Sequence, residues 1–293
     1  MPQNVRQQSQ NAPLRAAIVY DFDGTLARGN IQERSFIPDC GMDHDAFWLE
    51  VKKTARACDA DDILVYMHKM VEKARELGRP VTRAQLQQHG SDPDLFDGLD
   101  HWFDRMNEFA ADIGLDLEHY VISSGIYEMI EGSPIFRKFQ QVYASRFLYD
   151  AKGHAVWPAL AINYTSKTQF LYSINKGVEH VWDSEAINRW MPEAKRPVPF
   201  ERMIFIGDGD TDIPSMKTVM KEGGCSIAVL DPALWSDELK VAKLHKLIAE
   251  DRVRFAAMAD YQKGEQLDVI VKGALHRIAL RAGVSKAEAQ LTR

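Results

Sequence analysis

Four short apolar runs constrain the fold of this chain more than any other feature of its sequence. They occupy residues 16–22, 119–124, 202–208 and 225–230. Each run is largely continuous rather than alternating and ends in a turn, as is typical of strands that are buried on both faces of a parallel sheet. Helical patterns, such as residues 98–114, lie between the runs. We therefore predict an α/β fold with a Rossmann-like, doubly wound parallel sheet.

One long segment between the first two runs departs from this alternation and contains no convincing strand. Residues 43–57 and 59–78 have the apolar spacing of amphipathic helices. Thr82 can cap a third, shorter helix with its hydroxyl. We predict an all-helical domain at residues 30–95, inserted into a core domain made of residues 16–29 and 96–293.

Three other regions have their own patterns. Residues 140–149 and 155–165 are separated by a polar turn that contains Gly153, which predicts a β-hairpin. After residue 231 the sequence is mostly helical. Residues 1–15 are polar and rich in Gln and Asn, so we expect a flexible tail there.

Charge and composition narrow the classes of function. A net charge of -6 over 293 residues is mild, so nucleic acid is not an expected partner. The first residues lack the apolar segment of a signal peptide, and no later run approaches the roughly 18 apolar residues of a membrane span. The cysteines, Cys40, Cys58 and Cys225, show no CxxC spacing, which argues against a disulfide framework or a zinc cluster. We expect a cytoplasmic protein without a membrane partner.

Carboxylates follow two of the predicted strands directly. Asp21 and Asp23 end the first run, while Asp208 and Asp212 follow the third. If both strands belong to one parallel sheet, their carboxyl ends meet at the same edge and the four side chains converge. Such convergence is costly unless a cation neutralises it, and a site with only oxygen ligands suits Mg²⁺. The purely structural alternative, that these residues cap helices and shape turns, explains any one of them but not the combination.

Other known binding motifs do not match the sequence around these carboxylates. A calcium-binding EF-hand loop that started at Asp208 would need Gly and Glu where this chain has Ile213 and Val219. A dinucleotide fingerprint would need a third glycine after Gly207 and Gly209. The chain also has no G-x-x-x-x-G-K-[ST] phosphate-binding loop.

The strings DFDGTL at residues 21–26 and GDGDTD at residues 207–212 resemble the first and fourth motifs of the haloacid dehalogenase (HAD) superfamily. The second motif of that family is a Ser or Thr at a strand end, which Ser123 supplies. The third is a Lys before the fourth motif, and we choose Lys176 over the neighbouring Lys167 because Gly177 and a helical pattern follow it. The helical insertion is similar to the C1 cap of the phosphoserine phosphatase-like branch.

This resemblance implies roles for the residues at the motif positions. Asp21 would attack phosphorus and form an aspartyl-phosphate, and Asp23 would be the general acid and then the general base. Ser123 would bind a phosphate oxygen, and Lys176 would offset charge on the transferring group. The ligands of Mg²⁺ would be Asp21, Asp208, Asp212 and the backbone carbonyl of Asp23. Further phosphate-binding groups would come from Gly24, Ser124 and Gly125.

The expected function is Mg²⁺-dependent hydrolysis of a small phosphorylated metabolite. A phosphotransferase with the same nucleophile and a non-catalytic binding protein of the HAD fold remain as alternatives. Specificity should reside in the insertion, where Glu33, Arg34, Phe36 and Arg56 are candidates for reading the leaving group.

Overall fold

The computed structural model describes residues 13–209 and 211–291, and its centre is a seven-stranded sheet. The strand order is β4-β3-β2-β1-β5-β6-β7. The four predicted parallel strands are confirmed: they pair in parallel, with β1 between β2 and β5. Most of the predicted tail lies outside the described residues, and β1 begins two residues earlier than expected. The bounds of these strands are β1 (Leu14–Tyr20), β2 (Leu115–Ile126), β5 (Met203–Gly207) and β6 (Cys225–Leu230).

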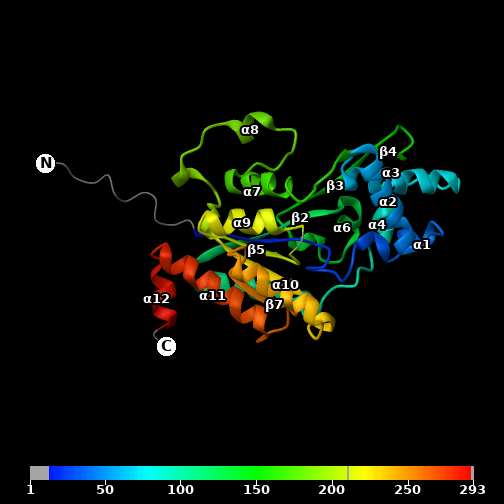
Figure 1. The fold of residues 1–293 in the computed structure, drawn as a ribbon. Helices are drawn as coiled ribbons and strands as arrows, with labels where there is room; N and C mark the ends of the chain where they lie inside the picture. The colour runs from blue at the N-terminus through cyan, green and yellow to red at the C-terminus, as the bar shows by residue number, and fades with distance from the viewer. Residues whose placement is uncertain (1–12, 210, 292–293) are drawn as a thin grey trace.

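Helices cover both faces of the sheet, as the doubly wound fold requires (Figure 1). Alternate side chains of β1 pack against the helices on opposite faces of the sheet. Ala17 and Val19 belong to one apolar cluster, while Ile18 and Tyr20 belong to the other. The first cluster includes side chains of α7 (Lys167–Lys176), α9 (Ile213–Lys221) and α10 (Glu238–Ala249). The second includes side chains of α5 (Leu99–Asp112) and α11 (Gln266–Arg281).

The sheet is extended at both edges. At one edge the predicted hairpin is confirmed, since β3 (Gln141–Tyr149) and β4 (Ala155–Leu160) pair antiparallel. At the other edge the structure adds β7 (Phe255–Met258), which we missed because its sequence, FAAM, is short and has no β-branched residue. The remaining helices of the core are α6 (Tyr127–Gly132), α8 (Ser184–Asn188) and α12 (Ser285–Leu291). None of the helices in the described ranges is both long and apolar enough to cross a membrane.

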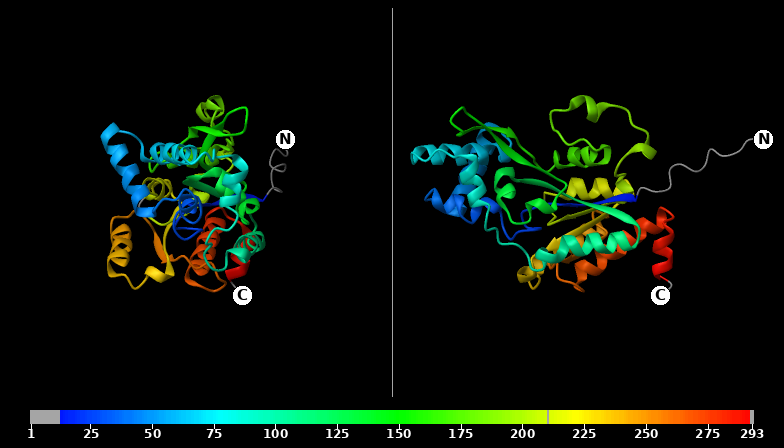
Figure 2. Two further views of the ribbon diagram at one scale, coloured as in Figure 1. Left: turned by 90° about the vertical axis from the view of Figure 1, so that its right-hand side faces the viewer. Right: turned by 180° about the vertical axis from the view of Figure 1, so that it is seen from behind.

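A group of helices between β1 and α5 lies at one end of the molecule, beyond the carboxyl edge of the central strands (Figure 2). We call these four helices the insertion. Side chains define where three of them begin, since Asp43, Asp61 and Thr82 each accept a hydrogen bond from a backbone N–H of the following helix. The four helices are α1 (Phe36–Asp39), α2 (His44–Cys58), α3 (Asp62–Glu76) and α4 (Arg83–His89).

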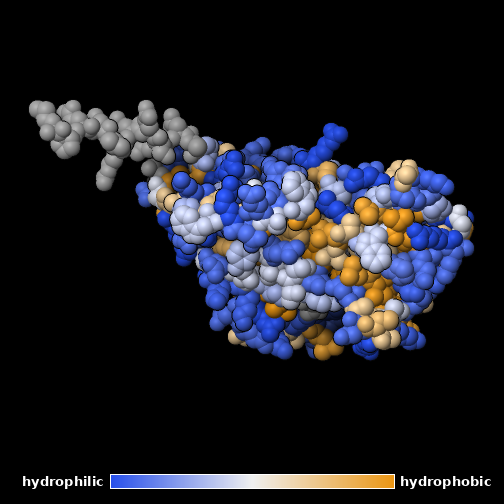
Figure 3. Space-filling view, turned by 90° about the horizontal axis from the view of Figure 1, so that it is seen from above, coloured by the Kyte–Doolittle hydropathy of each residue, from blue (hydrophilic) through white to orange (hydrophobic). Residues whose placement is uncertain are grey.

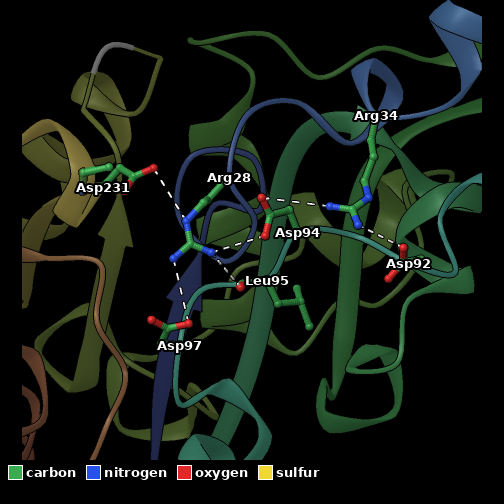
Figure 4. A network of polar contacts seen from close by, with 8 residues as sticks. Arg28, Arg34, Asp92, Asp94, Leu95, Asp97 and Asp231 are labelled. Carbon is green, nitrogen blue, oxygen red and sulfur yellow. Dashed lines mark hydrogen bonds and ion pairs between the residues drawn. The ribbon is translucent and has the colours of Figure 1, made fainter.

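The two chain segments that connect the insertion to the core lie side by side and are held by Arg28 (Figure 4). The backbone N–H of Arg28 donates to the carbonyl of Asp94 at 2.7 Å, and that of Phe96 donates to Leu26 at 3.0 Å. The Arg28 guanidinium also packs over the Phe96 ring, 4.7 Å from its centroid. Its ionic and polar contacts are Asp94 (3.3 Å), the Leu95 carbonyl (3.1 Å), Asp97 (3.9 Å) and Asp231 (3.8 Å).

The last helix of the insertion is also fixed to the core through α6. Gly132, at the end of α6, lies so close to α4 that a β-carbon there would be 2.0 Å from the carbonyl oxygen of Gln87. Contact between two backbones leaves neither side free to yield, because no flexible side chain is involved. The α4–α6 contact therefore anchors the insertion independently of Arg28.

Two Gly→Ala substitutions, one in the α4–α6 contact and one in open space on α11, should have opposite effects on stability. Gly132→Ala should lower the free energy of unfolding by about 1–3 kcal/mol, because the new methyl group overpacks against the Gln87 carbonyl. Gly273→Ala, inside α11 with no atom within 4 Å of the new carbon, should raise it by about 0.5–1 kcal/mol through helix propensity. Urea titration measures both. Equal changes for the two variants would contradict the tight contact.

Candidate active site

The carboxylates of two neighbouring strands converge at the carboxyl edge of the sheet. Asp21 follows β1 directly and Asp208 follows β5, and these strands are adjacent in the sheet. Asp21, Asp208 and Asp212 each offer an oxygen that lies within 4.8 Å of the others. Asp21 and Asp212 are buried, while Asp208 is exposed. Asp210, between them in sequence, lies outside the described residues.

A glycine turn makes this convergence possible. Gly24 has a φ of +72°, which side chains rarely tolerate, and a β-carbon there would lie 2.7 Å from Oδ2 of Asp208. The loop after β1 can therefore approach the loop after β5 only with glycine at this position. The Gly24 N–H itself donates to the carbonyl of Ala27 at 2.8 Å.

Lys167 supplies the positive charge between the carboxylates. Its ammonium is completely buried and lies 2.8 Å from Oδ2 of Asp21 and 2.8 Å from Oδ1 of Asp212. Lys167 is the first residue of α7, so its side chain reaches the carboxyl edge of the sheet where that helix begins. The attraction of the two carboxylates at hydrogen-bond distance offsets the free energy that is lost when the ammonium leaves water.

Our choice of Lys176 as the motif lysine was therefore wrong. Lys176 is the last residue of α7, about 13 Å further along the helix axis, and donates to the backbone carbonyls of Ile187 and Arg189. We interpreted Gly177 as the start of a helix, whereas its φ of +67° makes it the C-terminal cap of α7. The lysine at the helix start, the position that the motif favours, is Lys167.

Burial and mutual repulsion shift the ionisation of these groups. Burial, together with the charge of Asp212, raises the pKa of Asp21, while Lys167 opposes the shift. Burial and the charge of Asp21 raise the pKa of Asp23 well above its usual range, against a hydrogen bond from the Ile31 N–H. Burial disfavours the ammonium of Lys167, but Asp21 and Asp212 outweigh it and raise its pKa. Lys167 is therefore charged, and Asp23 favours its protonated form.

The acidic cluster has the properties of a Mg²⁺ site. Its donors are all carboxylate oxygens, which is the ligand type that Mg²⁺ prefers. One oxygen, Oδ2 of Asp212, is buried and has no hydrogen-bond partner among the described residues. An unpaired buried carboxylate oxygen is costly, and a bound cation would remove that cost. The side chain of Asp23 is not in this cluster.

The second group of polar residues lies at the end of β2. Ser123 is fully buried, and its Oγ accepts a hydrogen bond of 2.9 Å from the Gly125 N–H. A β-carbon at Gly125 would lie 2.8 Å from Oδ2 of Asp23, so the Asp23 carboxyl is packed against this turn. The Ser124 carbonyl accepts from Tyr66 of α3 at 2.6 Å, whereas the Ser124 hydroxyl is buried without a partner among the described residues.

These hydrogen bonds correct part of the predicted phosphate site. We expected backbone N–H groups around Gly24 and Gly125 to bind phosphate, and the N–H groups of these two glycines themselves already have acceptors inside the chain. Their contribution is the tight turn that each makes possible. Ser123 and Ser124 both line the cavity next to these turns.

A cavity of about 770 Å³ separates the acidic cluster from the insertion. Its inner wall contains Asp21, Asp23 and Ser123. Its outer wall comes from the loop before α1 and from α2 and α3, and includes Glu33, His44, Trp48, Leu49, Ile63 and Tyr66. Apolar surface also gathers toward the insertion end of the molecule when it is seen from above (Figure 3). The inner wall of the cavity is therefore charged, and its outer wall is partly aromatic.

One of the four specificity candidates lies in this cavity. The Glu33 carboxylate is held there by the Trp48 indole at 2.7 Å and by His44 at 2.8 Å. Arg34 instead pairs with Asp92 at 2.9 Å, Phe36 is buried in the core, and Arg56 is exposed on α2 without lining the cavity. We missed Trp48 and Tyr66, whose apolar spacing on amphipathic helices resembled that of core residues.

Two methionine substitutions test which lysine holds the acidic cluster. Lys167→Met should lower the free energy of unfolding by about 3–5 kcal/mol at neutral pH, because it leaves two buried carboxylates without their cation. The loss should shrink as the pH falls, because protonation removes the uncompensated charge. Lys176→Met, which loses only bonds to backbone carbonyls, should cost about 1 kcal/mol. Urea unfolding across pH separates them, and a larger loss for Lys176→Met would reverse the assignment.

Residues 18–217 match the family of haloacid dehalogenase-like hydrolases. An uncharacterized protein of Borreliella burgdorferi is 27% identical over 278 residues, which span 86% of this chain and 93% of that protein.

Several solved structures share the fold at low sequence identity. A HAD family hydrolase from Salmonella enterica serovar Typhi has a TM-score of 0.55 at 13% identity, over 90% of this chain and 72% of its own. A substrate-bound phosphoserine phosphatase has a TM-score of 0.52 at 15% identity, over 88% of this chain and 98% of its own. A probable phosphoserine phosphatase from Vibrio cholerae has a TM-score of 0.55 at 13% identity, over 93% and 69%. The family match, the sheet and the helical insertion agree: this chain belongs to the haloacid dehalogenase-like hydrolases.

Proposed function

We propose that this protein is a Mg²⁺-dependent phosphomonoester hydrolase that acts on a small phosphorylated metabolite through an aspartyl-phosphate on Asp21. One observation carries the proposal: the buried ammonium of Lys167 lies 2.8 Å from both Asp21 and Asp212, beside Asp208 and at the floor of a cavity. A cation, a nucleophile and a set of metal ligands are the parts that phosphoryl transfer requires. The similar folds of two phosphoserine phosphatases support this choice of reaction.

Asp21 is the nucleophile in the first step. A carboxylate oxygen of Asp21 forms a bond to phosphorus as the bond between phosphorus and the leaving oxygen breaks. Hydrogen bonds from the Phe22 N–H, at 2.7 Å, and from Lys167 fix the orientation of this carboxylate. Lys167 also offsets the negative charge on the transferring group.

Asp23 handles the proton in both steps. Its raised pKa favours the protonated form, which can donate its proton to the leaving alcohol as the first bond breaks. The resulting carboxylate then accepts a proton from water, whose oxygen attacks phosphorus and releases Asp21. The hydrogen bond from the Ile31 N–H, at 2.9 Å, holds the Asp23 side chain toward the insertion, where the leaving group would lie.

The remaining polar residues position the phosphate. Asp21, Asp208 and Asp212 would hold Mg²⁺, with the backbone carbonyl of Asp23, and the ion would neutralise the phosphate charge that these carboxylates otherwise repel. Ser123 would donate its hydroxyl proton to a phosphate oxygen, since its Oγ already accepts from Gly125.

A hydrolysis screen over phosphomonoesters tests the reaction. The wild-type protein should release inorganic phosphate in the presence of Mg²⁺ and lose this activity when EDTA removes the metal. Asp21→Asn, which keeps the shape of the side chain but removes the nucleophile, should lower kcat by at least about 10⁴-fold. Full activity of Asp21→Asn, or no hydrolysis of any phosphomonoester by the wild type, would refute the proposed function.

The leaving group tests the role of Asp23. Asp23→Asn should lower kcat/KM for an alkyl phosphate by about 10²–10⁴-fold, but should lower kcat/KM for p-nitrophenyl phosphate much less, because its leaving group needs no proton. In the wild type, kcat/KM for the alkyl phosphate should fall as the pH rises through the raised pKa of Asp23, since the acid form is then lost. Equal losses of kcat/KM for both substrates would exclude Asp23 as the general acid.

A further inference from the structure

A hydrogen bond between side chains joins the segments that lead into two helices, one in the insertion and one in the core. The Asn163 side-chain amide donates from Nδ2 to Oδ2 of Asp61 at 2.6 Å. Asn163 lies in the core between β4 and α7, and Asp61 precedes α3 of the insertion. The bond therefore crosses between the insertion and the core beside the cavity.

On the core side, the other atom of the same amide organises the beginning of α7. Oδ1 of Asn163 accepts from the Thr165 N–H at 3.2 Å and from the Ser166 N–H at 3.0 Å. The Asn163 carbonyl accepts from the Lys167 N–H at 3.0 Å. Asn163 thus closes the turn that leads directly into Lys167, whose ammonium lies between Asp21 and Asp212.

On the insertion side, the Asp61 carboxylate has the matching arrangement. Its Oδ1 accepts from the Ile63 N–H at 2.9 Å and the Leu64 N–H at 3.0 Å, which caps α3, while its Oδ2 receives Asn163. A parallel bond lies next to it, since the Tyr164 hydroxyl donates to Asp62. Movement of α3 away from the core would break both bonds.

We propose that Asn163 is a positioning residue that couples the seating of α3 on the core to the placement of Lys167. This inference rests on the proposed function, because it concerns the charge that Lys167 supplies to the reaction. When α3 is seated, both ends of the Asn163 amide are bonded and the first turn of α7 is held in place. When α3 moves away, Nδ2 loses its acceptor and that turn loosens. The coupling is reciprocal, so an ordered Lys167 site also favours the seated insertion.

Reversing the polarity of the bond tests this coupling. Asn163→Asp keeps an acceptor for the turn before α7 but turns a second carboxylate oxygen toward Asp61. Asp61→Asn keeps the cap of α3 but turns an amide donor toward the Asn163 amide. Each single variant should lower kcat about tenfold, and the double variant, in which donor and acceptor have exchanged places, should recover most of the wild-type kcat.

A matched substitution controls for the helix cap alone. Asp43→Asn makes the same change at the cap of α2, where the side chain accepts from the Ala46 N–H and has no further hydrogen bond within residues 13–209 and 211–291, and should leave kcat unchanged. The second measurement is amide hydrogen exchange, which does not depend on activity. Asn163→Asp should speed exchange in the first turns of both α3 and α7, and the double variant should restore protection.

The possible outcomes separate this inference from the proposed function. An active wild type with unchanged kcat and exchange in Asn163→Asp would overturn the coupling and leave the hydrolase proposal intact. Failure of the double variant to recover either quantity would also overturn it. If the wild type hydrolyses no phosphomonoester, the proposed function fails, and linked exchange in α3 and α7 alone would still decide whether Asn163 joins them.

Discussion

The contact of one buried ammonium with two buried carboxylates is the interaction on which the rest of the site depends. Without Lys167, Asp21 and Asp212 would be two like charges in a low-dielectric environment, which would lower the free energy of unfolding by about 3–5 kcal/mol. With it, the carboxyl ends of β1 and β5 can bring their acids together. Because β5, the next strand after α7, is parallel to β1 and begins at the opposite edge, α7 begins at the carboxyl edge, and Lys167 as its first residue lies beside these acids.

The insertion completes the site by forming the opposite wall of the cavity. The Ala155 N–H of β4 donates to the carbonyl of Val81, between α3 and α4, at 2.7 Å. Three further connections to the core are the paired connecting segments around Arg28, the backbone contact between α4 and α6, and the polar contacts of α3 with Asn163 and Ser124. The first two are backbone contacts that would survive small movements of α3. The third consists of individual hydrogen bonds next to the candidate catalytic groups. A movement of α3 would therefore change the hydrogen bonds of the site before it changed the other contacts of the insertion.

Much of this arrangement could be predicted because it depends on local sequence. A continuous apolar run followed by DxDG or GDGxxD specifies both a buried strand and the acids at its end, and the position of Asp21 relative to Asp208 follows from parallel pairing. The helices of the insertion and the Thr82 cap are likewise local features. The sequence did not identify the motif lysine, because Gly177 is compatible with the start or the end of a helix. Only the bounds of α7 show that Lys167 is its first residue and that Gly177 follows its last. The bonding of the Gly24 and Gly125 N–H groups depends on turn geometry, which motif letters do not specify.

The most direct test of this account is to trap the covalent intermediate. The wild-type protein would be mixed with ³²P-labelled substrate and Mg²⁺, quenched in acid within milliseconds, digested with trypsin and analysed by mass spectrometry. The account predicts a hydroxylamine-sensitive label on the peptide of residues 16–28, located at Asp21 by fragmentation. A label on Asp23 or Ser123, or substrate turnover without any labelled protein, would contradict it.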